Sequence, residues 1–422
     1  MKKQPFIFSA KFLTDGLCFA LAKGTSFLVP LLAVRLMTLA DYGFLETSFA
    51  WGQQLTTLLV LGLPAAYPFF ILKQRETAMQ FYFWAYGAAL FLFACLAGAL
   101  YLAGGLGRQP YFVFILMVLM AMERILSSIL KTHGLGKIGV LVDSLYYFGL
   151  GVSLLVFRLA PFKSFFEILF LVLFLALSLL GVWNVVMLRS RVRHFERSTF
   201  ASAVKRLLGF SIPLIFSGLI IYWLVACSRI YLSWLLGNET VGIYSFCFRF
   251  LAIAILIYQF AYIMFFKKLY IVSTEKLDRN FAFLLGAVFI CSVFCLAVFF
   301  LIRRFFPTIR YGKLLLVLLE LGCFMPIWCA TALSEGIIAR ENQILKMNLI
   351  LLPQIVLFPL IVFLLRSKIT LESFCTLHLC SCALVFFSQS AILCKKHIRL
   401  VKSSVIIGAI TVCGIVSFII MN

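Results

Sequence analysis

The segment FAFLLGAVFICSVFCLAVFFLI, at residues 281–302, contains no charged side chain, and Arg279 and Arg303 flank it. An α-helix rises about 1.5 Å per residue, and the hydrocarbon core of a bilayer is roughly 30 Å thick. About 20 apolar residues therefore cross the core once, so this segment is long enough. The pattern predicts a transmembrane helix.

The same pattern recurs along the whole chain. Of the 422 residues, 64% are apolar and only 12% are charged, whereas a soluble domain has roughly 25% charged residues. The apolar runs are too long and continuous for barrel strands, which alternate over about ten residues. We therefore expect an all-α polytopic membrane protein with about 12 transmembrane helices. The predicted spans are 12–35, 43–72, 79–106, 110–132, 138–159, 164–188, 208–236, 240–266, 281–302, 313–339, 345–365 and 372–394.

Basic residues gather in alternate connections between these spans. The stretches 189–206 and 395–402 are rich in Lys and Arg, whereas the turn at 238–239 has neither. Cytoplasmic loops carry the excess of Lys and Arg, so the pattern places the N-terminus in the cytoplasm. The connection 303–313 departs from the pattern. The net charge of +22 is thus explained by topology, and no nucleic-acid partner is expected.

The basic stretch also divides the chain. We predict an N-terminal six-helix lobe (1–188), a basic cytoplasmic linker (189–207), a C-terminal six-helix lobe (208–394) and a tail (395–422). The tail contains a thirteenth apolar segment at 403–421, and composition leaves open whether it crosses. A weak internal repeat relates the turns 36–44 and 235–243, which suggests parallel repeats. Transporters often place a substrate site between such halves.

Several motifs resemble those of polysaccharide-biosynthesis flippases of the Wzx type, in the MOP (MATE-like) superfamily. They are Lys23-Gly24, Pro30-Leu31, Arg35-Leu36, Asp41-Tyr42-Gly43, Gly62-Leu63, Ser211-Ile212-Pro213, Val241-Gly242-Ile243-Tyr244 and Arg249-Phe250. Ser228 stands where family members commonly have an acidic residue before Arg229.

The resemblance implies two lobes in a V-shaped bundle in the inner (cytoplasmic) membrane of a bacterium. It implies movement of an undecaprenyl-pyrophosphate-linked oligosaccharide, the repeat unit of O-antigen or a related polysaccharide of lipopolysaccharide biosynthesis. The polymerase and chain-length proteins of that pathway are then candidate partners, besides the lipid bilayer itself.

Four cations lie inside predicted spans and away from their ends: Lys23, Arg124, Arg229 and Arg249. Each would cost roughly 2.5–3.5 kcal/mol in lipid at a helix centre, so they should face protein or a water-filled cavity. Arg suits a pyrophosphate because its planar fork donates two parallel hydrogen bonds. The hypothesis is a cationic central cavity that holds the pyrophosphate. Alternatively, Glu123 and Arg124 form a structural ion pair, and Arg229 and Arg249 reach the outer interface.

Polar residues beside these cations complete the predicted site. Tyr222 shares a helix face with Arg229, and Gln53 shares one with Glu46, so both are candidate substrate-binding residues. Burial raises the proton affinity of a carboxyl group, which makes Glu46 and Glu320 candidates for proton coupling. Acids near span ends are interpreted as solvated: Asp15, Asp143 and Glu335.

No constellation for catalysis is apparent in the sequence. The four His residues lack metal-ligand spacing, and neither a Walker A motif nor GxSxG occurs. We therefore expect no enzyme activity, no cofactor and no metal. One alternative is a membrane polysaccharide polymerase or ligase, which needs a large outer loop. The other is a MATE-type exporter, which needs an acidic cavity for cations. Proton coupling of the flippase stays open.

Overall fold

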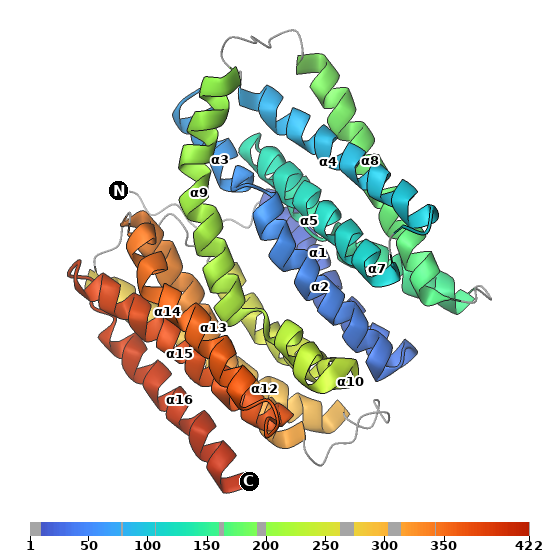
Figure 1. The fold of residues 1–422 in the computed structure, drawn as a ribbon. Coiled ribbons are helices and arrows are strands. Elements are labelled where there is room, and N and C mark those ends of the chain that lie inside the picture. The colour runs from blue at the N-terminus through green and yellow to red at the C-terminus, as the bar shows by residue number, and fades with distance from the viewer. Residues whose placement is uncertain are drawn as a thin grey trace. The chain divides into compact units, whose positions relative to one another are not determined.

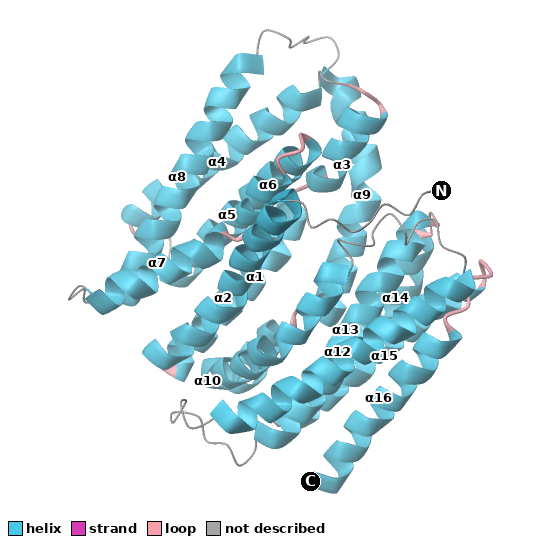
Figure 2. Cartoon of the chain, turned by 180° about the vertical axis from the view of Figure 1, so that it is seen from behind, coloured by secondary structure: helices cyan, strands magenta, loops and turns pink. Residues whose placement is uncertain are grey.

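The computed structural model describes residues 10–76, 79–105, 107–159, 164–191, 200–261, 274–302, 314–341 and 343–421. Within this part of the chain the regular elements are helices, and Figure 2 colours no strand in it. Helices follow from the apolar sequence, because inside lipid a helix satisfies its own backbone groups. In chain order they are α1 (Ala10–Leu36), α2 (Leu39–Leu59), α3 (Leu63–Pro68), η1 (Phe69–Lys73), α4 (Gln80–Leu102), α5 (Arg108–Thr132), α6 (Gly136–Val142), α7 (Leu145–Leu159), α8 (Phe165–Arg191), α9 (Phe200–Val225), α10 (Ser228–Leu251), η5 (Ala252–Ala254), α12 (Thr274–Ile302), α13 (Leu314–Arg340), α14 (Ile344–Leu364), α15 (Leu371–Cys394) and α16 (Val401–Met421).

Ten helices among the described residues are long and apolar enough to cross a membrane, or up to 12 if each of two bent pairs is one span. The prediction of an all-α polytopic membrane protein is therefore confirmed. One of the ten is the 60-residue stretch Ser202–Ala261, which Gly237 interrupts with a positive φ of 81°. Since one crossing needs about 20 residues, this stretch is long enough for two. The thirteenth apolar segment forms α16, which also has the length and composition of a span.

Two predicted spans are bent rather than continuous. The span 43–72 breaks after α2, where Leu61 and Gly62 adopt positive φ and Pro64 lies in the first turn of α3, and the two parts meet at 44°. Proline lacks a backbone N–H, so it favours the start of a helix over its interior. The span 138–159 breaks between α6 and α7 at 53°, around Asp143.

A third break divides the predicted span 208–236. Helix α9 ends at Val225 and α10 begins at Ser228. Neither glycine nor proline marks this position, so the sequence gives no signal for it.

The helices cluster into two compact units. The first comprises Met1–Pro30 with Trp51–Ile212, and the second comprises Leu31–Ala50 with Pro213–Asn422. In the first, α4 and α7 pack on α8, and α5 packs on α4, α6 and α8; in the second, α13 packs on α12, α15 and α16 (Figure 1). Helices α5 and α13 are the most buried candidate spans. In their most apolar 18-residue stretches, 72% and 83% of the residues are buried.

The predicted lobes 1–188 and 208–394 differ from these units, because contacts assign Leu31–Ala50 to the second unit. The lobe boundaries and the V shape stay predictions. Helices α8 and α9 extend into the two ends of the predicted linker 189–207, and residues 192–199 lie outside the described part. The exceptional connection 303–313 also lies outside it.

A close backbone contact explains why the start of α2 belongs to the second unit. A Cβ atom on Gly43 would lie 1.7 Å from the carbonyl oxygen of Asn238, and one on Gly242 would lie 2.2 Å from that of Leu39. Only glycine allows such an approach. The two turns of the predicted internal repeat therefore pack against each other through their glycines.

The outer faces of the helices are apolar. On α8, large exposed side chains recur every three or four residues, which places them on one helix face. They are Leu171, Leu175, Leu179, Val182 and Val186, with exposed fractions between 54% and 74%. Contiguous apolar surface of this kind is unfavourable in water and compatible with acyl chains.

Candidate functional site

Three charged side chains meet inside the second unit. Glu46 lies on α2, and Arg229 and Arg249 lie on α10. The Nε atoms of Arg229 and Arg249 are each 3.1 Å from a Glu46 carboxylate oxygen, and Nη2 of Arg249 donates to Oε2 at 3.2 Å. Tyr42 donates its hydroxyl proton to Glu46 at 3.1 Å, and Arg229 donates to Ser245 at 3.0 Å. We call Glu46, Arg229 and Arg249 the buried ion cluster.

The buried ion cluster is shielded on its flanks by aromatic rings. Arg229 lies over Phe248 at 4.8 Å, and Arg249 lies over Phe49 at 5.3 Å. Such contacts attract a guanidinium to the negative face of the ring. Glu46 is 2% exposed, and the two arginines are 6% and 8% exposed. Two guanidinium groups share one carboxylate, so the cluster carries one net positive charge.

These contacts concern three predicted site residues at once. Arg229 and Arg249 were expected to avoid lipid. Both are buried in ion pairs with Glu46 inside their own unit. Sequence reasoning assigned Glu46 to proton coupling and missed its pairing with the arginines. The signal was weak, because Glu46 and Arg249 are about two hundred positions apart in the chain.

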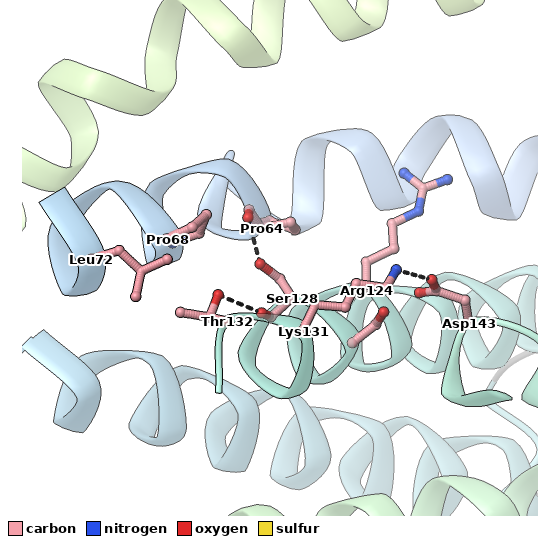
Figure 3. A pocket seen from close by; sticks show the side chains of 9 residues that line it. Pro64, Pro68, Leu72, Arg124, Ser128, Lys131, Thr132 and Asp143 are labelled. Atoms are coloured by element: carbon pink, nitrogen blue, oxygen red, sulfur yellow. Dashed lines mark hydrogen bonds and ion pairs between the residues drawn. The ribbon is translucent and has the colours of Figure 1, made fainter. Parts of the chain in front are cut away.

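The first unit contains a pocket of about 510 Å³ (Figure 3). Its apolar wall comes from α3 and η1, and its polar wall comes mainly from α5, with Asp143 added at the end of α6. The lining residues are Pro64, Pro68, Leu72, Arg124, Ser127, Ser128, Lys131, Thr132 and Asp143. We call this the α5 pocket.

Hydrogen bonds fix most of the polar wall. Lys131 Nζ contacts Asp143 Oδ2 at 2.5 Å, and Ser128 donates to the carbonyl oxygen of Pro64 at 2.6 Å (Figure 3). Thr132 donates to the backbone carbonyl of Ser128 at 2.7 Å. Among the described residues, the hydroxyl oxygen of Ser127 has no partner, although Ser127 is 1% exposed.

Lys23 and Arg124 both belong to the first unit. Lys23, on α1, is half-buried and interacts electrostatically with Asp143 and Lys131. Arg124 lines the α5 pocket. Its neighbour Glu123 is buried and accepts a hydrogen bond from the backbone N–H of Tyr146 at 2.8 Å. The four predicted cations are thus divided, with two on each unit.

Sequence reasoning did not include Ser127 or Lys131 in the site, and it interpreted Asp143 as a solvated acid near a span end. A usable signal existed. Arg124, Ser127, Lys131 and their neighbours recur at three- and four-residue spacing, so they form a polar stripe on an otherwise apolar helix. The turn that follows α5, together with α6, then brings Asp143 back to Lys131.

The other predicted residues are not among those that line the α5 pocket. Tyr222 donates to the backbone carbonyl of Ala50 at 2.8 Å. Gln53 is half-buried on α2. Glu320, on α13, is 1% exposed and accepts a hydrogen bond from Thr376, while its second carboxyl oxygen has no partner among the described residues. Within the same part of the chain, no group of three or more His, Cys, Asp or Glu residues is placed to hold a metal ion.

Comparison with known families gives one match. The family described as polysaccharide biosynthesis protein matches residues 16–266, which is more than half of the chain. Comparison with curated proteins gives no significant match, and comparison with solved structures gives none either.

Proposed function

Because the chain belongs to the polysaccharide biosynthesis protein family, we propose that it is a flippase for a lipid-linked saccharide. Its substrate is an undecaprenyl-pyrophosphate-linked oligosaccharide, such as an O-antigen repeat unit. The protein carries it from the cytoplasmic to the outer leaflet of a bacterial inner membrane by alternating access, with its own N-terminus in the cytoplasm. It acts as a transporter, and it neither makes nor breaks a covalent bond of the substrate.

The observation that carries this proposal is how the intramembrane cations are held. Arg229 and Arg249 are buried on Glu46 within their unit, and Arg124 lines a pocket in the other. A charge inside a span is costly in lipid and usually marks a substrate or ion pathway. The cations that line the α5 pocket, Arg124 and Lys131, favour an anionic substrate over the cationic one of an exporter.

Pyrophosphate matches these cations chemically. Arginine donates two parallel hydrogen bonds to phosphate oxygens, and lysine supplies a point charge. The membrane potential also favours outward movement. About two negative charges that cross 100 mV, inside negative, gain roughly 4–5 kcal/mol.

Proton coupling forms a second part of the proposal. Glu320 is the better candidate, because it is buried and one carboxyl oxygen lacks a partner among the described residues. Two arginine contacts favour a structural role for Glu46. Equal rates of flipping with and without a proton gradient would exclude coupling.

The direct test is translocation by the purified protein in liposomes. Lipid-linked oligosaccharide with a fluorescent sugar is loaded on both leaflets, and a membrane-impermeant quencher then reports how fast the inner pool becomes accessible. The protected fraction is the fluorescence that the quencher cannot reach, and we expect it to fall only when the protein is present. Arg124→Ala should slow this fall by about tenfold or more, since a hydrogen bond to a charged group contributes about 1.5–3 kcal/mol. Arg158→Ala is the matched control, because Arg158 is exposed on α7 of the same unit.

A protected fraction that stays as large as in protein-free liposomes would refute the proposal. Lengthened glycan products would instead identify a polymerase. Movement of organic cations without movement of the lipid-linked saccharide would identify an exporter.

A further inference from the structure

The α5 pocket has an unusual polar wall for a helix of a membrane protein. Arg124, Ser127 and Lys131 line it together, at spacings that place them on one face of α5. Arg124 and Lys131 are positive and Asp143 is negative, so the wall carries one net positive charge. Half-buried Lys23, which interacts with Asp143 and Lys131, adds a second positive charge nearby.

Ser127 indicates that the wall is incomplete without a ligand. Its hydroxyl oxygen is buried and has no hydrogen-bond partner among the described residues. Leaving a buried polar group unsatisfied costs about 1–3 kcal/mol, so such groups are rare unless something else satisfies them. A serine hydroxyl beside two cations is a hydrogen-bond donor suited to a phosphate oxygen.

Lys131 is held by a partner that an anion can replace. Its Nζ atom contacts Asp143 at 2.5 Å, and both side chains are partly exposed, at 44% and 30%. Exposed pairs contribute only about 0–1 kcal/mol, so the lysine can leave Asp143 at little cost. A phosphate with two negative charges competes well for a lysine that one carboxylate holds.

The opposite wall suits a lipid. Pro64, Pro68 and Leu72 form it, and Leu72 is 60% exposed. An apolar chain attached to the anion can therefore lie along Leu72 while the charged group contacts α5. A free anion would make no use of this wall.

We propose that the α5 pocket is a phosphate-ester site in the first unit, where the anion binds Arg124 and Ser127 and displaces Asp143 from Lys131. The ligand class is a mono- or diphosphate. The identity of the molecule that carries the anion rests on the proposed function, whereas the existence of the site does not.

Binding of inorganic pyrophosphate to the purified protein in detergent tests the site. Isothermal titration should show saturable binding that Arg124→Ala weakens by about tenfold or more. Asp143→Asn should strengthen binding by about fivefold, because it removes a negative charge and releases Lys131. Wild-type protein that binds no pyrophosphate at millimolar concentration, or an Asp143→Asn variant that binds more weakly than wild type, would overturn the proposal.

Glu76→Gln is the matched control for Asp143→Asn. Glu76 accepts two hydrogen bonds from Arg206 in the same unit, so this variant also removes one negative charge and releases one cation. It leaves the α5 pocket intact and should not change pyrophosphate affinity. Equal strengthening by both variants would mean that general charge, and not the pocket, governs binding.

Ser127→Ala separates a ligand contact from a structural defect. As a contact, Ser127 contributes a hydrogen bond to the anion, and its loss should weaken binding by about threefold or more. Unchanged affinity with a higher unfolding temperature would remove Ser127 from the site, because it would then be an unsatisfied group only. The small change in volume leaves the fold intact.

Two parallel experiments, each with a different lipid, identify the source of the anion. Undecaprenyl pyrophosphate and phosphatidylglycerol, each in nanodiscs, are tested as competitors of labelled pyrophosphate. Competition by the first alone assigns the site to the proposed substrate, and competition by both assigns it to lipid phosphate in general. Pyrophosphate binding by a protein that does not flip lipid would refute the proposed function and leave the site standing.

Discussion

Removing the carboxylate of Glu46 should destabilise the second unit strongly. Glu46→Gln keeps the shape of the side chain and an oxygen for Tyr42, but it leaves Arg229 and Arg249 without a counter-ion. Both arginines are at least nine-tenths buried. Breaking a buried ion pair by removing one partner costs about 3–5 kcal/mol. We expect a loss of about 3 kcal/mol, because the glutamine oxygen still accepts one hydrogen bond.

The measurement is unfolding of purified protein in detergent by increasing SDS, followed by circular dichroism. Glu239→Gln is the control, because Glu239 lies exposed on the same helix, α10, as the arginines. It should unfold like wild type.

A double variant tests the coupling. In Glu46→Gln with Arg249→Met, one cation is removed together with the carboxylate, so the loss should be smaller than the sum of the two single losses by about 1–3 kcal/mol. A Glu46→Gln variant as stable as wild type, or single effects that simply add, would refute the reasoning that the cluster is a coupled unit.

Two further predictions concern packing and capping in the second unit. Gly242→Ala places a Cβ atom 2.2 Å from the carbonyl oxygen of Leu39 and should lower the free energy of unfolding by about 1–3 kcal/mol in the same assay. The control is Gly286→Ala, which should not destabilise the protein because its Cβ atom has no neighbour within 4 Å. Equal stability of the two variants would contradict the close contact. Asp278→Ala removes the acceptor for the backbone N–H groups at the start of α16, including that of Ser403 at 3.1 Å, and should cost about 0.5–2 kcal/mol. Limited trypsin digestion should then cut faster at the start of α16, and an unchanged cleavage rate would contradict the capping role.

The sequence predicted the fold class because the constraint is local. A run such as 281–302 has no other way to satisfy its backbone in lipid than to form a helix. Most predicted spans are found as helices for this reason. The breaks near Gly62 and Gly237 carry glycine as a visible signal, whereas the break at Ala226 and Cys227 carries none.

The predicted site was only partly anticipated. The cost of an intramembrane charge identified Arg124, Arg229 and Arg249 as residues that avoid lipid, and that reasoning uses the sequence alone. Which partner each one finds depends on contacts between distant segments. Glu46 and Arg249 meet at 3.1 Å because α2 packs on α10, and Gly43 and Gly242 allow the two backbones to approach closely.

Composition and the spacing of apolar residues thus determined that this chain forms membrane helices and that its cations avoid lipid. Tertiary structure alone decided that Lys131 pairs with Asp143 and that Ser127 is left without a partner among the described residues. The physical reason is the distance along the chain over which each interaction acts. Helix formation and burial cost act within a turn or two of the chain, whereas an ion pair or a pocket wall needs atoms that only packing brings together.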